Sequence, residues 1–337
     1  MPRAPGFWAA DGNMLLPLLL APVAAAVTWQ TARRLARPGW HAPVPVLCVG
    51  NATLGGAGKT TVALDLVARL DAAGRVPHAL LRGYGGTVRR VHRVATGDPA
   101  ALVGDEALLL AARAPTWVGA DRAASAAAAA AAGAGVLVMD DGLQNPGLAK
   151  DVALLVIDGG FGFGNARVLP AGPLREPVAA ACTRCTAAVL IGPDRHGATA
   201  ALPPGLPLLR ARLVAEAAPD LRGTRVLAFA GIARPGKFFD SLAEAGAEIV
   251  ARTAFPDHHA FTAREMARLL ASAARFGAVP VTTAKDAVRL PAAVRAAVRV
   301  LGVRLCWEDE AAPAALLARL APSGITPPAG SRTPPAG

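Results

Sequence analysis

Short apolar runs alternate with helix-period stretches over most of the chain after residue 40. Runs of this kind are predicted to be strands at Val44–Val49, Ala79–Leu81, Gly135–Met139, Val152–Ile157 and Ala188–Ile191. Each run is short and apolar throughout, as is typical of strands buried on both faces of a parallel sheet. Because helical stretches separate them, we predict an α/β fold in which helices cover both faces of a parallel sheet.

A second, smaller α/β unit is predicted after a linker rich in Pro and Gly at residues 203–223. Apolar runs at Arg225–Ile232, Glu248–Phe255 and Val279–Thr283 alternate there with helical stretches at Gly236–Ala245 and Thr262–Phe276. The pattern predicts a first domain over residues 41–220 and a second over residues 221–322. Residues 323–337 are rich in Pro and Gly, which predicts a disordered tail.

Residues 1–40 contain an apolar segment that is too short to span a bilayer. Met14–Trp29 is 16 residues long, whereas a spanning helix needs ~20. Arg33, Arg34 and Arg37 follow it, and positive charge holds that side in the cytoplasm. We predict a peripheral or monotopic helix whose arginines meet anionic head groups. The alternative is a helix that packs within the protein.

The amino-acid composition limits the kinds of molecule that the protein is expected to bind. The net charge of +11 over 337 residues favours an anionic substrate, a membrane or nucleic acid. Aromatic residues make up only 4% and there is one tyrosine, so a base-stacking surface is hard to build and nucleic acid is disfavoured. The four cysteines are too scattered for a disulfide framework, which favours a reducing cytoplasm. Cys182 and Cys185 have zinc-like spacing, but no second pair follows them.

A glycine-rich loop follows the first strand. Gly50–Thr61 reads G-N-A-T-L-G-G-A-G-K-T-T and leads into a helical stretch. Backbone N–H groups of such a loop and the helix N-terminus bind phosphate, while the lysine adds charge and the threonine hydroxyl can ligate Mg²⁺. We therefore predict a site for ATP and Mg²⁺. Its nucleotide-binding residues are Thr53, Leu54, Gly55, Gly56, Ala57, Gly58, Lys59 and Thr60.

Lysine usage points to the same residue. The chain has 31 Arg but only four Lys, so a lysine that remains is expected to need its compact ammonium, which arginine does not replace at a tight phosphate site. Lys59 fits this interpretation. Lys285, in Thr282-Thr-Ala-Lys-Asp286, is the next candidate, whereas Lys150 and Lys237 are attributed to drift.

Two acidic motifs could serve phosphoryl transfer. Asp140 and Asp141 end the strand at Gly135–Met139, where a P-loop fold holds its Mg²⁺-linked acid. Asp105 and Glu106 precede a helical run and could simply complement the helix dipole. The alternative is that one carboxylate takes a proton from an alcohol while another oxygen holds Mg²⁺.

A histidine doublet and a rigid loop complete the candidate chemistry. Asp257-His258-His259 follows a strand of the second unit, but no third metal ligand lies at sensible spacing. His258 could instead tune a catalytic carboxylate across the domain cleft, or the motif could be an ordinary surface loop. Arg175, in a loop rich in Gly and Pro, could bind a substrate phosphate bidentately, through two N–H groups of its guanidinium.

Together these motifs resemble the tetraacyldisaccharide 4'-kinase family, from about Pro43 to Leu290. Thr61 and Asn145 depart from the family, which usually has proline and often has histidine there, and the second departure puts the polar role of that position in doubt. The resemblance rests on Val49-Gly-Asn51, Gly55-Gly56-x-Gly58-Lys59-Thr60, Arg82-Gly-Tyr84-Gly, Gly104-Asp105-Glu106, Asp121-Arg122, Asp140-Asp141-Gly-Leu-Gln144, Phe163-Gly-Asn165, Leu169-Pro-Ala-Gly-Pro-Leu-Arg175-Glu-Pro177, Phe229-Ala-Gly-Ile232, Asp257-His258-His259 and Thr282-Thr283-x-Lys285-Asp286.

The resemblance implies a kinase of lipid A (lipopolysaccharide) biosynthesis. ATP would phosphorylate the 4'-hydroxyl of a membrane-embedded tetraacyldisaccharide 1-phosphate to give lipid IV-A, at the cytoplasmic face of the inner membrane. By analogy, Lys59 and the loop amides hold the phosphates, and Asp105 is the base, supported by His258 when the two domains close. We expect a monomer. The implied Mg²⁺ ligands are Thr60, Glu106 and Asp141, and substrate contacts are expected at Arg82, Tyr84, Arg122, Asn145 and Arg175.

Two other functions stay open at this point. One is a membrane-recruited P-loop ATPase switch that phosphorylates nothing, although the chain has no guanine-reading N-K-x-D motif. The other is a P-loop kinase of a small molecule, which leaves the apolar N-terminal segment unexplained.

Overall fold

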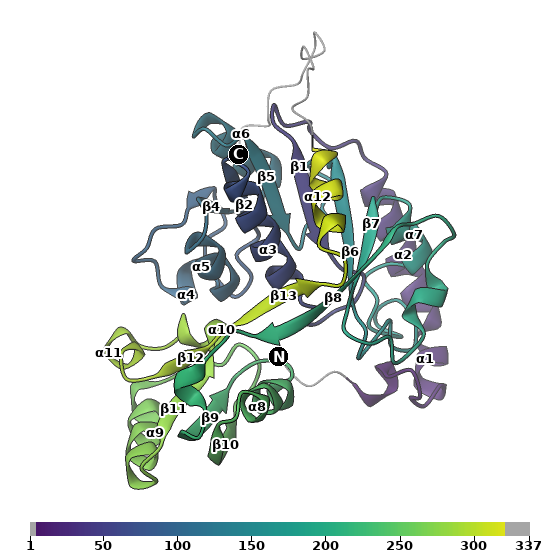
Figure 1. Cartoon of the computed structure of the whole chain (residues 1–337). Helices are drawn as coiled ribbons and strands as arrows, with labels where there is room; N and C mark the ends of the chain where they lie inside the picture. Colours follow the sequence, from purple (N-terminus) through teal and green to yellow (C-terminus); the bar gives the residue numbers. More distant parts are fainter. Residues whose placement is uncertain (1–4, 321–337) are drawn as a thin grey trace.

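The computed structural model describes residues 5–320 and contains two sheets, each flanked by helices (Figure 1). The larger has nine strands in the order β13-β8-β7-β6-β1-β5-β2-β4-β3, and the smaller has four in the order β10-β9-β11-β12. Strands β2, β5, β1, β6, β7 and β8 are mutually parallel, and only the edge strands β3 and β13 run antiparallel to their neighbours. The predicted α/β fold with a second, smaller α/β unit is confirmed.

The strands have the following bounds: β1 Val46–Gly50, β2 Pro77–Leu81, β3 His92–Arg93, β4 Thr116–Val118, β5 Val136–Asp140, β6 Val152–Asp158, β7 Ala187–Ile191, β8 Leu208–Ala215, β9 Arg225–Ala230, β10 Glu248–Ala254, β11 Val279–Thr283, β12 Arg299–Leu301 and β13 Val303–Trp307. The α-helices are α1 Leu15–Leu19, α2 Ala21–Leu35, α3 Lys59–Ala72, α4 Ala100–Val103, α5 Asp105–Ala111, α6 Arg122–Ala131, α7 Val178–Cys182, α8 Pro235–Glu244, α9 Ala263–Arg275, α10 Ala284–Ala287, α11 Ala292–Arg295 and α12 Ala311–Ala318. Short 3-10 turns occur at Gly6–Trp8, Ala198–Ala201 and Pro219–Leu221.

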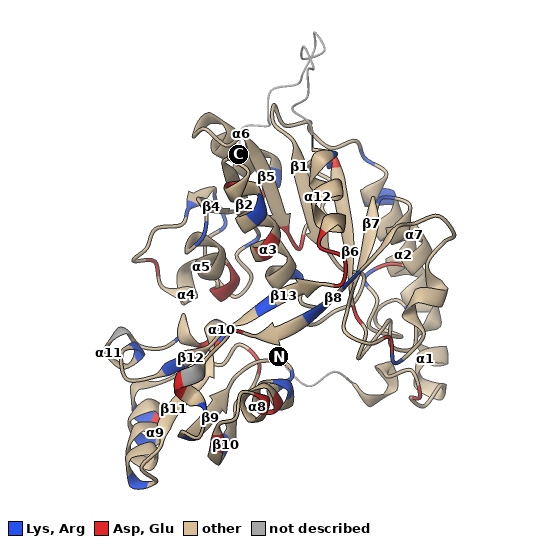
Figure 2. Ribbon diagram, in the orientation of Figure 1, with Lys and Arg blue, Asp and Glu red and all other residues tan. Residues whose placement is uncertain are grey.

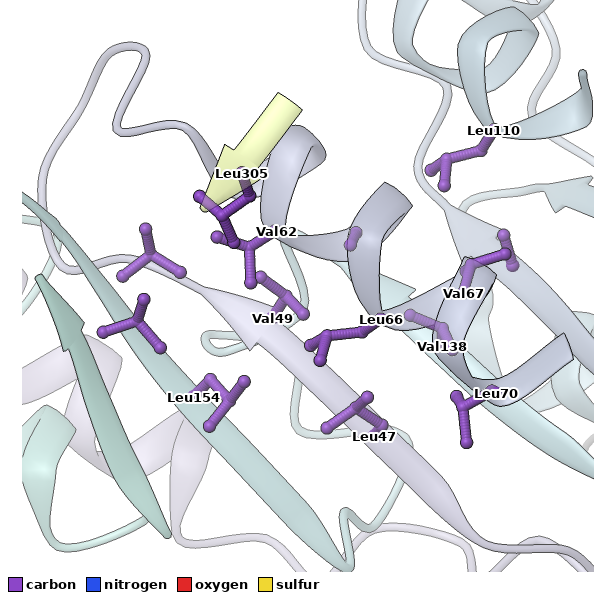
Figure 3. Packing of buried hydrophobic residues seen from close by; sticks show 14 of the residues in the cluster. Leu47, Val49, Val62, Leu66, Val67, Leu70, Leu110, Val138, Leu154 and Leu305 are labelled. Atoms are coloured by element: carbon purple, nitrogen blue, oxygen red, sulfur yellow. The ribbon is translucent and has the colours of Figure 1, made fainter. Parts of the chain in front are cut away.

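The central strands of the large sheet are buried on both faces because helices cover each side. Helices α3, α5 and α12 lie on one face, and α2, α6 and α7 lie on the other. Figure 3 shows Val62 and Leu66 of α3 packed over Leu47 and Val49 of β1. This packing fixes the start of α3 directly beyond the end of β1, where a phosphate would be bound.

The domain boundary differs from the prediction at the C-terminal end. Strand β8 lies where a linker was expected, and β13 pairs with it antiparallel at the edge of the large sheet. Helix α12 then returns to the first domain, where Leu305, Trp307, Leu316 and Leu320 are buried in its core. Residues 303–320 belong with the first sheet because their apolar side chains complete its core. The expected disordered tail lies outside the described residues.

The N-terminal segment forms two helices instead of one. The short helix α1 carries no charged side chain (Figure 2), and α2 continues almost directly from it. Ala24 is buried against the first domain, whereas Leu15 is 71% exposed and Leu19 is 77% exposed. Among residues 5–320, no helix has both the length and the apolar character that crossing a membrane requires.

Candidate active site

The glycine-rich loop turns between β1 and α3 in the way the sequence predicts. Gly58 has φ +85°, a backbone conformation that residues with a side chain rarely adopt, which explains the glycine there. A neighbouring segment supports the loop: the Leu54 amide donates to the Pro173 carbonyl at 2.8 Å, and the Arg175 amide donates to the Ala52 carbonyl at 2.7 Å. These two hydrogen bonds hold the first part of the loop against the segment at residues 173–175.

The two acids that end β5 make different contacts. The Thr60 hydroxyl donates to Asp140 Oδ2 at 2.8 Å. Asp141 has φ +52°, rare for a residue other than glycine, and lies 3.6 Å from Lys59 Nζ. Arg175 donates to both Asp141 oxygens at 2.7 and 3.0 Å. The arginine expected to bind a substrate phosphate is thus paired with Asp141.

The local field separates the pKa values of these adjacent carboxyl groups. Burial, followed by the negative charge of Glu106, raises the pKa of Asp140 to about 7, although Lys59 and the Thr60 hydroxyl oppose the shift. Burial also acts on Asp141, but the positive charges of Lys59 and Arg175 outweigh it and lower its pKa. Asp141 is therefore a stable anion beside the phosphate loop.

The acids and the Thr60 hydroxyl suit a magnesium ion. Asp140 Oδ1 is buried and has no hydrogen-bond partner within the described residues, and carboxylate and hydroxyl oxygens are the ligands that Mg²⁺ prefers. No three His, Cys, Asp or Glu side chains between residues 5 and 320 converge as a complete metal cage. Thr60, Asp140, Asp141 and Glu106 would thus hold Mg²⁺ together with nucleotide phosphates. The predicted ligands were Thr60, Glu106 and Asp141, and Asp140 is a further carboxylate in contact with the Thr60 hydroxyl.

Asp105 occupies the start of α5, opposite the second domain. Gly104 before it has φ +90°, and a Cβ there would lie 2.5 Å from the Tyr84 carbonyl, so glycine lets the Arg82–Gly85 turn pack against this helix. Asp105 is only 3% exposed, and its Oδ2 lies 3.1 Å from His258 Nδ1 and 3.5 Å from Arg289 Nε. The proposed base and its histidine, 153 positions apart in the sequence, are in contact.

The second domain keeps Asp105 ionised. Burial alone would raise the pKa of this carboxyl, but contact with His258 and the positive charges of Lys285 and Arg289 outweigh it and lower the pKa. A buried carboxylate that stays ionised can accept a proton from an alcohol brought beside it.

The loop that carries His258 is held in a conformation unusual for its residue type. His258 has φ +59°, and its amide donates to the Gly231 carbonyl at 3.1 Å. Arg289 donates to the His259 and Gly231 carbonyls at 3.0 and 2.9 Å and so fixes this loop. The Tyr84 ring lies 5.6 Å from the His258 ring, which places this expected substrate contact at the site. Arg289 was missed by sequence reasoning; its only signal is the spacing of one helical turn after Lys285.

Lys285 reaches the same cluster from α10. Its Nζ lies 3.3 Å from Glu106 Oε1, 3.4 Å from His258 Nε2 and 4.0 Å from Asp105 Oδ2. Burial would lower the pKa of this lysine, but Glu106 and Asp105 outweigh it and raise the pKa. The lysine that the sequence singled out after Lys59 therefore lies among three predicted functional residues.

Three further residues were expected to contact the substrate: Arg82, Arg122 and Asn145. In the part of the chain that the structure describes, none of them forms a hydrogen bond or ion pair with Asp105, His258 or Lys285. Asn145 Oδ1 accepts from the Gly147 amide at 2.9 Å, so the side chain closes its own turn. Arg122 is buried and donates to the Gly119 carbonyl, and burial together with the charge of nearby Arg82 lowers its pKa to about 10. Among the described residues, neither Arg82 nor Arg122 has an acidic partner within ion-pair distance.

The fold and this geometry define a class of protein. A phosphate loop, an acid at the end of the adjacent strand and a carboxylate that meets a second α/β domain are the parts of a two-domain P-loop phosphotransferase.

Comparison with known proteins narrows this class to one family. The family model described as tetraacyldisaccharide-1-P 4'-kinase matches residues 14–321. The tetraacyldisaccharide 4'-kinase of Gluconacetobacter diazotrophicus is 61% identical over 94% of this chain and 97% of its own length, and that of Rhodospirillum centenum is 57% identical over 91% and 93%. The chain belongs to this kinase family, as the sequence motifs predicted.

A solved structure agrees with the assignment. The crystal structure of LpxK from Aquifex aeolicus in complex with ATP superposes with a TM-score of 0.75 at 25% sequence identity. The superposition covers 91% of this chain and 99% of that one, so both domains are shared.

Proposed function

We propose that this chain transfers the γ-phosphoryl group of ATP to the 4'-hydroxyl of tetraacyldisaccharide 1-phosphate, giving lipid IV-A in lipid A biosynthesis. The observation that carries the proposal is the buried contact between Asp105 and His258, 3.1 Å apart, on the same side of the sheet as the phosphate loop. Membership of the tetraacyldisaccharide-1-P 4'-kinase family supplies the acceptor.

The phosphate loop and its neighbours hold the donor. Amides of residues 53–60 bind the phosphate oxygens. Lys59, whose ammonium lies beside Asp141, neutralises the outer phosphates. When bound, Mg²⁺ neutralises charge on the β- and γ-phosphates. Thr60, Asp140, Asp141 and Glu106 would hold it, while Arg175 keeps the Asp141 carboxylate in place.

Asp105 activates the acceptor. As the 4'-oxygen forms its bond to the γ-phosphorus, Asp105 accepts the hydroxyl proton, and the bond from the γ-phosphorus to the bridging oxygen breaks. ADP leaves with that electron pair, and Asp105 later releases its proton to solvent. His258 supports the base from the second domain, so transfer requires the domains to be closed, which also excludes water.

The two domains also meet at a second ion pair, away from Asp105 and His258. Asp158, at the end of β6, accepts from Arg234 at the start of α8 at 2.7 Å. Two separate charged contacts therefore join the domains on their facing surfaces, and we propose that both form when the site closes.

The substrate is reached from a membrane surface. Leu15, Leu18, Leu19 and Trp29 are exposed on α1 and α2, and Arg33 and Arg34 occupy the last turn of α2. An apolar face bordered by arginines suits the interface of an anionic leaflet. We propose that the enzyme associates peripherally with the cytoplasmic face of the inner membrane, acts as a monomer and uses Arg82 and Tyr84 to contact the glycolipid, whereas Arg122 is buried and supports this region through the Gly119 carbonyl.

A transfer assay tests the function. The chain is incubated with γ-labelled ATP, Mg²⁺ and the disaccharide lipid in detergent micelles, with Asp105→Asn as the matched control. We expect label at the 4'-position with the natural chain and almost none with the control. Lipid-stimulated release of free phosphate without labelled lipid would support an ATPase switch instead. Label transferred only to water-soluble alcohols would support a small-molecule kinase.

A further inference from the structure

The Thr282-Thr-Ala-Lys-Asp286 motif contains one side chain that is not used to build its own turn. The Thr282 hydroxyl donates to the Phe229 carbonyl at 2.7 Å, and the Thr283 hydroxyl donates to Asp286 at 2.6 Å. Asp286 also accepts from the Gly231 amide at 3.0 Å. These contacts fix the start of α10, and Lys285 is the side chain of the motif that extends to the first domain, beside Arg289 one helical turn later.

The Lys285 ammonium contacts the acceptor side of the site at several atoms. Glu106 Oε1 is 3.3 Å away on the first domain, and His258 Nε2 is 3.4 Å away on the second. An ammonium can only donate, so in the tautomer that carries its proton on Nδ1, the nitrogen that faces Asp105, Nε2 accepts from Lys285. Asp257 lies farther from the same Nε2, at 3.7 Å.

We propose that Lys285 is a positioning residue for phosphoryl transfer, which holds Glu106, His258 and through them the Asp105 carboxylate in one arrangement when the domains meet. The inference rests on the proposed function, in which Asp105 is the base. A small, freely rotating ammonium can serve three partners in different directions, whereas the planar fork of arginine cannot. This explains why a chain that uses 31 Arg and only four Lys keeps a lysine here.

The simpler explanation is that Lys285 is one more ion pair across the domain interface. The chain offers a matched control, because Lys237 of α8 also crosses the interface, with its Nζ 3.5 Å from Asp158. An interface role predicts similar effects for the two lysines. A positioning role predicts an effect at Lys285 alone, and only while Asp105 is present.

The experiment is a double-mutant cycle on the full chain. Transfer to the disaccharide lipid is measured for Lys285→Met, Lys285→Arg and Lys237→Met, each alone and combined with Asp105→Ala. We expect Lys285→Met to lower kcat by ~10–10²-fold with little change in either KM, in the range of groups that assist general-base catalysis. Lys285→Arg recovers part of this loss, and Lys237→Met changes kcat by less than about twofold, as for an exposed ion pair.

The combined variants decide between the two roles. Lys285→Met adds almost nothing to Asp105→Ala if it acts through the base, because residues that work as one unit are not additive. Losses that multiply, a rise in KM without loss of kcat, or an equal effect of Lys237→Met would overturn the proposal. Lys285→Arg serves as the second variant if the methionine variant unfolds in thermal melts. Failure of the natural chain to transfer label would contradict the proposed function itself.

Discussion

The two halves of the active site are assembled in different ways. The phosphate half is made by one domain: Lys59, Thr60, Asp140 and Asp141 come from the adjacent ends of β1 and β5 and the start of α3. The acceptor half is shared between domains, because Asp105 meets its histidine only across the interface.

Because the two halves are assembled differently, we expect substitutions in them to have different effects on ATP binding and on turnover. The phosphate half is built on the buried core of the large sheet, within a single domain. The acceptor half depends on charged contacts between two domains, which the chain connects after β8 and again before β13. Changes in the first half should therefore remove donor chemistry altogether, whereas changes in the second should lower turnover while ATP still binds.

Substitution of Lys59 should give the largest loss. Lys59→Ala is expected to lower kcat by at least ~10²–10³-fold, the size typical of removing a group that stabilises transition-state charge. Lys59→Arg should be nearly as damaging because a planar fork does not fit a point-charge site. Steady-state kinetics and circular dichroism are the measurements. A well-folded Arg variant with high activity would contradict the role inferred from lysine usage.

Substitution in the acceptor half should spare ATP binding. Asp105→Ala is expected to lower kcat by at least ~10²-fold, in line with general-base effects, with little change in the Kd for ATP measured by calorimetry. His258→Ala should cost less, and the double variant should resemble Asp105→Ala because the two residues act together. Losses that multiply would show that His258 is only a loop residue.

Disruption of the exposed apolar face should weaken lipid use alone. Leu15→Ser, Leu18→Ser and Leu19→Ser together are expected to raise the KM for lipid by at least ~10-fold, since burying each leucine is worth about 1.5–3 kcal/mol. The KM for ATP should stay constant. Val300→Ser, an exposed apolar residue of the second domain, is the matched control. Substitution is sharper than deletion of residues 1–37, because Ala24 of α2 belongs to the core. Equal rises in both KM values would mean that the helices are structural.

The pH dependence of turnover should report the field around Asp105. Its pKa is lowered, so the base stays ionised as the pH falls through the usual carboxyl range, and kcat declines only at lower pH. Removing His258, the largest factor that lowers this pKa, should move the acidic limb of the kcat profile upward. A full pH profile of the natural chain and of His258→Ala checks this. An unchanged limb would show that another group limits the rate.

The sequence by itself determined the α/β alternation and the phosphate half of the site. Short apolar runs that alternate with helical stretches are typical of buried parallel strands, and a contiguous glycine loop with Lys59 and Thr60 carries its own geometry. Order along the chain also placed Asp140 and Asp141 at the sheet edge, whereas their different partners, Thr60 for Asp140 and Lys59 with Arg175 for Asp141, came from the fold.

Only the tertiary structure decided the acceptor half. The contacts of Asp105 with His258 and of Lys285 with Glu106 join residues 153 and 179 positions apart, and local propensity does not encode such distances. Arg175, expected on a substrate phosphate, pairs in the structure with Asp141, which lies 34 positions away in the sequence and is brought beside it by the fold. The return of β13 and α12 to the first domain has the same origin. Their apolar side chains are stabilised by burial, but the sequence does not specify which of the two sheets buries them.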